Sequence, residues 1–329
     1  MRYLIHILLT ALLLPSCFQE EDMVPSHEQG DLEVGQAAQG TFYERQVYYD
    51  LFSNDEISSN LISEYDLSFE SSSGGWIIRL NSSKFMLAGN SGDTVFSKEI
   101  VAADLEMNFD KSDGNPDSTA IGAWFEVGEE FTESHRFVYL VDRGKNENNK
   151  PVGLKKVQFE ISGDEYVMRY ANKDNSKDTT VVIPRDPDMD QVYFSFDSGL
   201  KEIAPLPDLW SLLFSKYTTM LQTDEGEDYP YLVTGVLLNP NTVMVVQDTV
   251  HDFMDITRDN IFGLGFTEQS DVIGYDWKYY NFDAGVYTIV PDMNYVIRDR
   301  DGFFYKLRFI DFNNDMGEKG YPTFEFVRL

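Results

Sequence analysis

The stretch from Met244 to Arg258 is where the sequence concentrates side chains that bind transition metals. It holds Met244 at its start and His251 with Met254 three residues later. On a helix, His251 and Met254 would share one face, and haem iron accepts imidazole and thioether groups as axial ligands. A surface histidine beside core methionines explains the same residues, so both interpretations stay open.

Other chemistry lacks an anchor in the sequence. No H-E-x-x-H, G-x-S-x-G, P-loop or G-x-G-x-x-G motif stands in a fitting context. Residues 110–117, DKSDGNPD, resemble a calcium loop but lack its closing Glu, which favours a turn. His135 opens a predicted strand, where an exposed imidazole is the simplest expectation. With 56 acidic residues, carboxylate pairs arise by chance. We therefore predict a protein that is not an enzyme.

Composition limits the partners and the means of stabilisation. The chain has 26 basic and 56 acidic residues, a net charge of −30, which repels nucleic acid. Hydrophobic residues make up 42% of the chain, enough for a sizeable core. Cys17 is the only cysteine, so no intramolecular disulfide can form.

The N-terminus predicts export. MRYLIHILLTALLLPSC combines an arginine with an apolar run too short to span a bilayer, which fits a signal peptide over residues 1–16. Leu14–Cys17 resembles a bacterial lipobox, in which Cys17 is lipidated, although an ordinary signal with an incidental cysteine is the alternative. The acidic run 18–22 resembles the surface-export signal of Bacteroidetes lipoproteins, which favours the outer face of the outer membrane. Residues 17–40 read as an acidic flexible tether.

Short alternating runs separated by Gly, Asn, Asp and Pro dominate the rest of the chain. This spacing predicts an all-β protein with mainly antiparallel sheets, either sandwich-like or an open barrel. Helix is expected only at 208–221 and 248–257, and the former could also be a strand. A weak internal repeat predicts two β lobes, 41–197 and 198–329, unless common hairpin patterns merely imitate each other.

The segment NYVIRDRDGFFYKLRFIDF, residues 294–312, predicts a hairpin. A three-residue loop, 300–302, opposes Ile297 to Tyr305 and Tyr295 to Leu307, with Gly302 in the left-handed conformation. The bases Arg298, Lys306 and Arg308 then share one face of the hairpin. They either meet a ligand or pair with a neighbouring acidic strand.

This hairpin and three other segments resemble the HmuY family, haem-binding outer-membrane lipoproteins of Bacteroidetes. The other segments are EYDLSFESSSGGWIIRLNSSKFMLAGNSG, LWSLLFSKYTTML with YPYLVTGVLLNP, and IGYDWKYYNF. The resemblance implies a mostly β fold that grips haem between loop and strand extensions for iron acquisition. It also implies a TonB-dependent outer-membrane receptor as partner and outer-membrane anchoring through lipid.

Family members hold haem by two axial His or Met side chains from the region that here contains Met244, His251, Met254 and Met293. The resemblance therefore implies a candidate neighbourhood, within which we expect His251 as one axial ligand and Met254 or Met244 as the other. Charge complementarity adds Arg258, Arg298 and Arg308 as candidate propionate contacts. The alternative is a non-catalytic adhesion module that does not bind haem, in which Trp277, Tyr279 and Tyr280 stack on a sugar or peptide.

Overall fold

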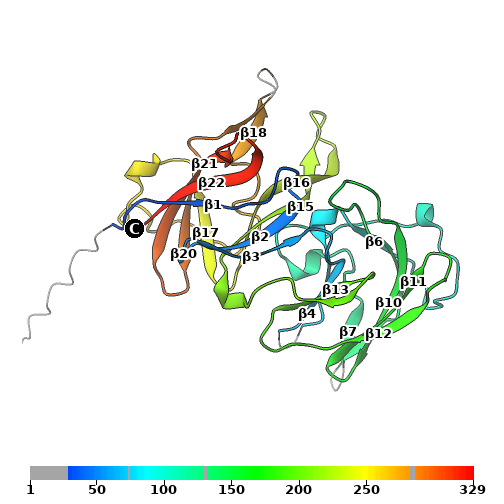
Figure 1. The fold of residues 1–329 in the computed structure, drawn as a ribbon. Helices are drawn as coiled ribbons and strands as arrows, with labels where there is room; N and C mark the ends of the chain where they lie inside the picture. Colours follow the sequence, from blue (N-terminus) through cyan, green and yellow to red (C-terminus); the bar gives the residue numbers. More distant parts are fainter. Residues whose placement is uncertain (1–28, 73–74, 129–131, 282, 284–285) are drawn as a thin grey trace, which may run out of the picture.

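The computed structural model describes residues 29–72, 75–128, 132–281, 283 and 286–329. The predicted signal peptide, Cys17 and the tether up to residue 28 lie outside the described residues. The part of the chain that is described consists of antiparallel strands and short 3-10 turns, with no α-helix (Figure 1). This confirms the predicted mostly β architecture, with open sheets rather than a closed barrel.

One lobe, here the terminal lobe, is built from both ends of the described chain. Its five-stranded sheet has the order β1-β22-β21-β20-β17 and its four-stranded sheet the order β16-β15-β2-β3. Their strands are β1 (Glu33–Gln36), β22 (Lys319–Arg328), β21 (Phe304–Asn313), β20 (Asn294–Asp299), β17 (Val243–Asp248), β16 (Asp228–Leu238), β15 (Leu212–Gln222), β2 (Arg45–Asp50) and β3 (Asp55–Leu61). A further pair, β18 (Lys278–Asn281) and β19 (Val286–Ile289), forms a separate hairpin.

The inner lobe lies between these two segments of sequence. A five-stranded sheet, β12-β11-β10-β9-β6, and a four-stranded sheet, β14-β13-β4-β5, enclose its core. Their strands are β12 (Thr179–Ile183), β11 (Glu165–Asn172), β10 (Leu154–Ser162), β9 (Val138–Asp142), β6 (Leu87–Asn90), β14 (Gly199–Lys201), β13 (Gln191–Ser195), β4 (Leu67–Glu70) and β5 (Ile78–Leu80). The short strands β7 (Phe125–Val127) and β8 (Thr132–Ser134) pair with each other.

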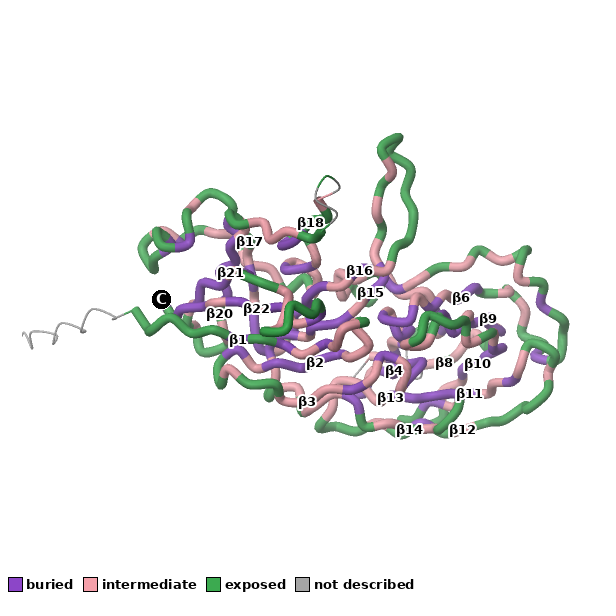
Figure 2. The backbone as a smooth tube through the Cα atoms, turned by 45° about the horizontal axis from the view of Figure 1, so that its top comes forward, coloured by how far each residue is buried: buried purple, intermediate pink, exposed green. Residues whose placement is uncertain are grey.

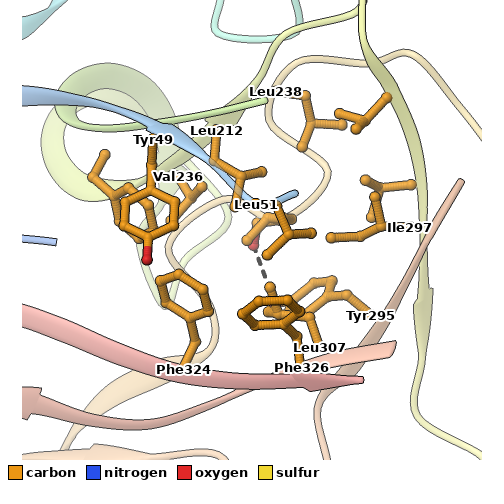
Figure 3. Packing of buried hydrophobic residues seen from close by; sticks show 14 of the residues in the cluster. Tyr49, Leu51, Leu212, Val236, Leu238, Tyr295, Ile297, Leu307, Phe324 and Phe326 are labelled. Atoms are coloured by element: carbon orange, nitrogen blue, oxygen red, sulfur yellow. Dashed lines mark hydrogen bonds between the residues drawn. The ribbon is translucent and has the colours of Figure 1, made fainter. Parts of the chain in front are cut away.

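Alternating residues of the terminal-lobe strands build one shared core. The aromatic and aliphatic side chains of the two sheets meet between them, as Figure 3 shows for Leu212, Val236 and Phe324. The predicted hairpin register is confirmed, because Ile297 opposes Tyr305 and Tyr295 opposes Leu307. Gly302 has a φ of +83°, the left-handed conformation that the three-residue loop requires.

The sheets do not follow the predicted division at Ser198. Leu212 of β15 pairs with Tyr49 of β2, so residues before 62 belong with strands after 211. The predicted tether is also too long, since β1 pairs with β22. Sequence repeats indicate local hairpins. The pairing of strands from opposite ends of the chain is a long-range feature that a local pattern does not predict.

Both predicted helices are corrected. Residues 212–222 form β15, paired over its whole length with β16 after a 3-10 turn, η4 (Pro207–Leu209), so the strand alternative holds there. At 248–257 only a 3-10 turn, η5 (Phe253–Asp255), is present. The Asp248 carboxylate accepts hydrogen bonds from the backbone of Val250 and His251, a local turn that competes with a helix.

Polar contacts join the two lobes. Thr218 of β15 donates its N–H to Ser82 Oγ at 3.0 Å, and Ser112 donates to Asp271 at 2.6 Å. Ser112 belongs to the DKSDGNPD run, which forms turns around the 3-10 turn η3 (Pro116–Ser118), as predicted. This run therefore has a structural role at the contact between lobes.

Candidate functional site

A long loop, residues 249–267, here called the covering loop, lies over one face of the five-stranded sheet. Its side chains Ile256 and Ile261 are buried against Val296 and Leu329. In Figure 1 it is the yellow segment that follows β17. The opposite face of the same sheet packs into the main core of the terminal lobe, so the covering loop is a separate layer.

His251 is held at the start of this loop by a buried carboxylate. Its Nδ1 lies 2.8 Å from Asp248 Oδ2, and the His251 side chain is 34% exposed. Burial raises the pKa of Asp248, but hydrogen bonds from the Val250 backbone and from His251 outweigh burial, and the net pKa is lowered. With Nδ1 bonded to Asp248, Nε2 is the nitrogen left to bind an external group. Histidines that ligate metals characteristically have such a carboxylate on the other nitrogen.

The methionines occupy different environments. Met254 lies in η5 and is 74% exposed, whereas Met244 in β17 is half-buried and opposite Arg298. Met293 is partly buried against the main core of the terminal lobe. Met254 and Met244 thus remain sterically accessible thioethers, while Met293 is better explained by packing.

The basic face of the predicted hairpin is mostly committed to structure. Lys306 is 1% exposed and donates to the carbonyl oxygens of Phe253 and Ile256, at 2.8 and 3.0 Å, which ties the covering loop to the sheet. Arg308 opposes Glu325 and donates to it at 2.5 Å. Of the acidic partners expected on a neighbouring strand, β22 supplies one, Glu325, and it pairs with Arg308 alone.

Arg258 and Arg298 are the exceptions. Both side chains are exposed, and neither forms an ion pair with another described residue. The Arg298 guanidinium carbon lies 6.0 Å from the centre of the Phe304 ring. These two bases therefore keep their charge available to an anion, in contrast to Arg308.

The aromatics of DWKYYN are divided between core and surface. Trp277 is 1% exposed and stacks on Phe309 with ring centres 4.1 Å apart, so it belongs to the core and cannot serve the alternative of stacking on a sugar or peptide. Tyr279 and Tyr280 are 50% and 42% exposed on β18. The β18–β19 and β15–β16 hairpins both project from the body of the terminal lobe (Figure 2). Sequence reasoning missed the exposed Tyr231 of β16, although YPYLV alternates as an extended strand does.

The described residues contain no group of three or more His, Cys, Asp and Glu side chains placed to hold a metal ion. Nor is any helix among them long and apolar enough to cross a membrane.

The fold and the covering loop define an all-β protein in which a buried carboxylate holds a partly exposed histidine. The HmuY protein family model matches residues 42–326, so the chain belongs to the HmuY family. Among solved structures, it is similar to apo PinO from Porphyromonas gingivitis, at 11% identity and a TM-score of 0.28, over 90% of this chain and 96% of that one. It is also similar to the apo HmuY analog TFO of Tannerella forsythia, at 11% identity and a TM-score of 0.26. That match covers 92% of this chain and 97% of the other. No curated protein matches the chain.

Proposed function

We propose that the protein is a cell-surface lipoprotein that binds haem without chemically transforming it and serves haem acquisition. Membership of the HmuY family supports this function. The observation that carries the site is the Asp248–His251 pair, in which a buried carboxylate orients an imidazole at the protein surface. His251 Nε2 would be one axial ligand of the iron.

The second axial ligand would be a thioether. Met254 is favoured because its side chain is 74% exposed and lies in the same loop as His251. Met244 is the alternative, since it lies on the sheet face that the covering loop approaches. Haem supplies the iron, and the covering loop supplies the ligands and the apolar surroundings.

The propionates would meet arginine. Arg258 and Arg298 have no ion-pair partner among the described residues, and charge-assisted bonds to carboxylates are strong. Arg308 ranks behind them because its guanidinium already bonds Glu325.

Anchoring and delivery complete the proposal. Cys17 would carry lipid on the outer face of the outer membrane, and a TonB-dependent receptor would take the haem. The lipobox-like residues before Cys17 support the anchor. Metabolic labelling with a fatty acid, compared between the wild type and Cys17→Ala, tests it, and equal labelling of the two chains would contradict it.

A hemin titration tests the central claim. We expect the chain from Phe18 onward to give a saturable Soret shift that disappears in the double variant His251→Ala with Met254→Ala. His135→Ala is the matched control and should bind as the wild type does. Comparing Met254→Ala with Met244→Ala identifies the thioether. The absence of a saturable shift, or an unchanged shift in the double variant, would refute the proposal.

A second function has one observation in its favour. Tyr279 and Tyr280 present half-exposed rings on a projecting hairpin, which suits stacking on a sugar or peptide. Such an adhesion module would bind glycans in an array and give no response to hemin.

A further inference from the structure

A cavity of about 690 Å³ lies where the two lobes meet, away from the covering loop. The inner lobe contributes the loop 145–149, and the terminal lobe contributes the residues before β2 and the β15–β16 hairpin. Its volume is within the usual range for sites that hold small molecules. The lining residues are Phe42, Ile62, Ser83, Lys145, Asn146, Glu147, Asn148, Asn149, Lys216, Tyr231, Leu232 and Lys319.

Three lysines line this cavity in a chain whose net charge is −30. Lys145, Lys216 and Lys319 form no ion pair with any residue that the structure describes. Lys216 Nζ donates to the Phe42 carbonyl oxygen at 2.8 Å. Burial lowers the pKa of Lys216, Glu44 opposes that effect, and Lys319 adds to it, which places these groups close together.

Two carboxylates lie near these lysines. One is Glu44, which accepts a hydrogen bond from the Phe42 backbone at 3.0 Å. The other is Glu147, which accepts one from the side chain of Asn148 at 3.1 Å. The lining itself contains three lysines and one glutamate, so it carries an excess of positive charge.

A fourth lysine, Lys278, lies near Tyr43, the neighbour of the lining residue Phe42. Lys278 is 8% exposed and has one hydrogen bond, to the Thr234 carbonyl oxygen at 3.3 Å. Its Nζ and that of Lys319 lie 5.9 and 5.8 Å from the centre of the Tyr43 ring. Both lysines therefore lie near the same ring, and because burial lowers the pKa of Lys278 to about 7, this lysine adds only part of a positive charge near neutral pH.

The remaining lining is suited to a polar ligand with flat apolar faces. Phe42 and Tyr231 are 73% and 51% exposed, so their rings are accessible from the cavity. Three asparagines add amides, each with two donors and an acceptor. An acidic sugar is recognised by aromatic rings that pack against its C–H groups, by amides that bond its hydroxyls and by ammonium groups that pair with its anions. The lining offers all three.

We propose that this cavity binds an anionic oligosaccharide bearing carboxylate or sulfate groups. Lys216 and Lys319 would bind the anionic groups, Tyr231 and Phe42 would pack against sugar faces, and the loop 145–149 would bond hydroxyls. This site shares no residue with the proposed haem site, so either function can fail without the other.

Calorimetry on the chain from Phe18 onward tests the site with three hexasaccharides: oligogalacturonate, a heparin-derived chain and neutral maltohexaose. We expect saturable binding of at least one anionic probe, weaker as salt rises, and at least tenfold weaker binding of maltohexaose. The carboxylated and sulfated arms identify the anionic group. Equal binding of maltohexaose, or no binding of either anionic probe, would overturn the proposal.

Variants locate the binding. Lys216→Ala with Lys319→Ala should weaken binding of the anionic probe at least tenfold, and Tyr231→Ala should weaken it severalfold. Lys173→Ala with Lys201→Ala removes the same charge outside the cavity and should bind as the wild type does. If the loss of the partly buried Lys216 prevents folding, Lys319→Glu replaces the double variant, because its side chain is at the surface. Equal effects of the cavity and control variants would place the ligand elsewhere.

Discussion

The two lobes use their charged residues differently. In the inner lobe, Asp66 is buried and bonds both Lys84 and Arg143, and Arg143 also bonds Asp197 at 2.6 Å. In the terminal lobe, exposed bases such as Arg258 and Arg298 form no ion pair with a described residue. Charges that are satisfied within the fold specify structure, whereas exposed unpaired ones can recognise a ligand. The proposed haem site uses bases of the second kind.

The largest expected effect comes from breaking the inner-lobe network. Asp66→Asn leaves Lys84 and Arg143 buried with little compensation, so the free energy of unfolding should fall by about 3–5 kcal/mol. Denaturant unfolding measures this loss. Asp178→Asn removes an exposed partner of Arg169 and should cost less than about 1 kcal/mol. Similar losses in the two variants would show that the buried network stabilises this lobe no more than an exposed ion pair does.

Like Lys306, Lys278 is a base of the terminal lobe that is buried rather than exposed. Burial lowers its pKa from 10.5 to about 7. Between these values the unfolded chain binds more protons than the folded protein, so the free energy of unfolding should rise with pH. The rise attributable to this group is about 1 kcal/mol per pH unit.

Lys278→Met should remove that rise and stabilise the protein near neutral pH. Unfolding curves recorded at intervals from pH 7 to pH 10 measure the slope, and Lys173→Met serves as an exposed control. A slope that is the same in wild type and Lys278→Met would mean that Lys278 is protonated in the folded protein.

Asp248→Asn tests how the terminal lobe prepares His251. The amide cannot support the imidazole as the carboxylate does, so hemin affinity should fall by about 10- to 100-fold. Asp252→Asn changes an exposed neighbour and should leave hemin binding unaltered. An Asp248→Asn chain that unfolds more easily yet binds hemin with wild-type affinity would assign Asp248 a purely structural role.

The sequence predicted local structure better than long-range assembly. The 294–312 hairpin could be predicted to the residue because its alternation and Gly302 allow only one register that keeps Tyr295 and Leu307 buried. The pairing of β2 with β15 could not be predicted, because it joins residues more than 150 positions apart. Local pattern contains no information about which distant strand edge is available.

The candidate site was predictable in part for the same reason. His251 stands out by residue type, but the supporting role of Asp248 depends on a turn that the helix prediction at 248–257 hid. Lys306 was grouped with the ligand candidates, yet it bonds two carbonyls of the covering loop, a contact between distant segments. The lysine-lined cavity needed residues from segments as far apart as Phe42 and Lys319 and gave no local signal.

The smallest expected effect distinguishes paired from unpaired bases within one lobe. Arg258→Gln and Arg298→Gln should each weaken hemin binding about two- to fivefold, because an exposed ion pair contributes about 0.5–1 kcal/mol. Arg308→Gln should change hemin affinity less and lower the free energy of unfolding instead, since its guanidinium bonds Glu325 across the sheet. Parallel hemin titrations and denaturant curves of the three variants measure both quantities. If Arg308→Gln alone weakened hemin binding, the ion pair with Glu325 would have to open on binding, and pairing within the fold would no longer identify which bases are free for a ligand.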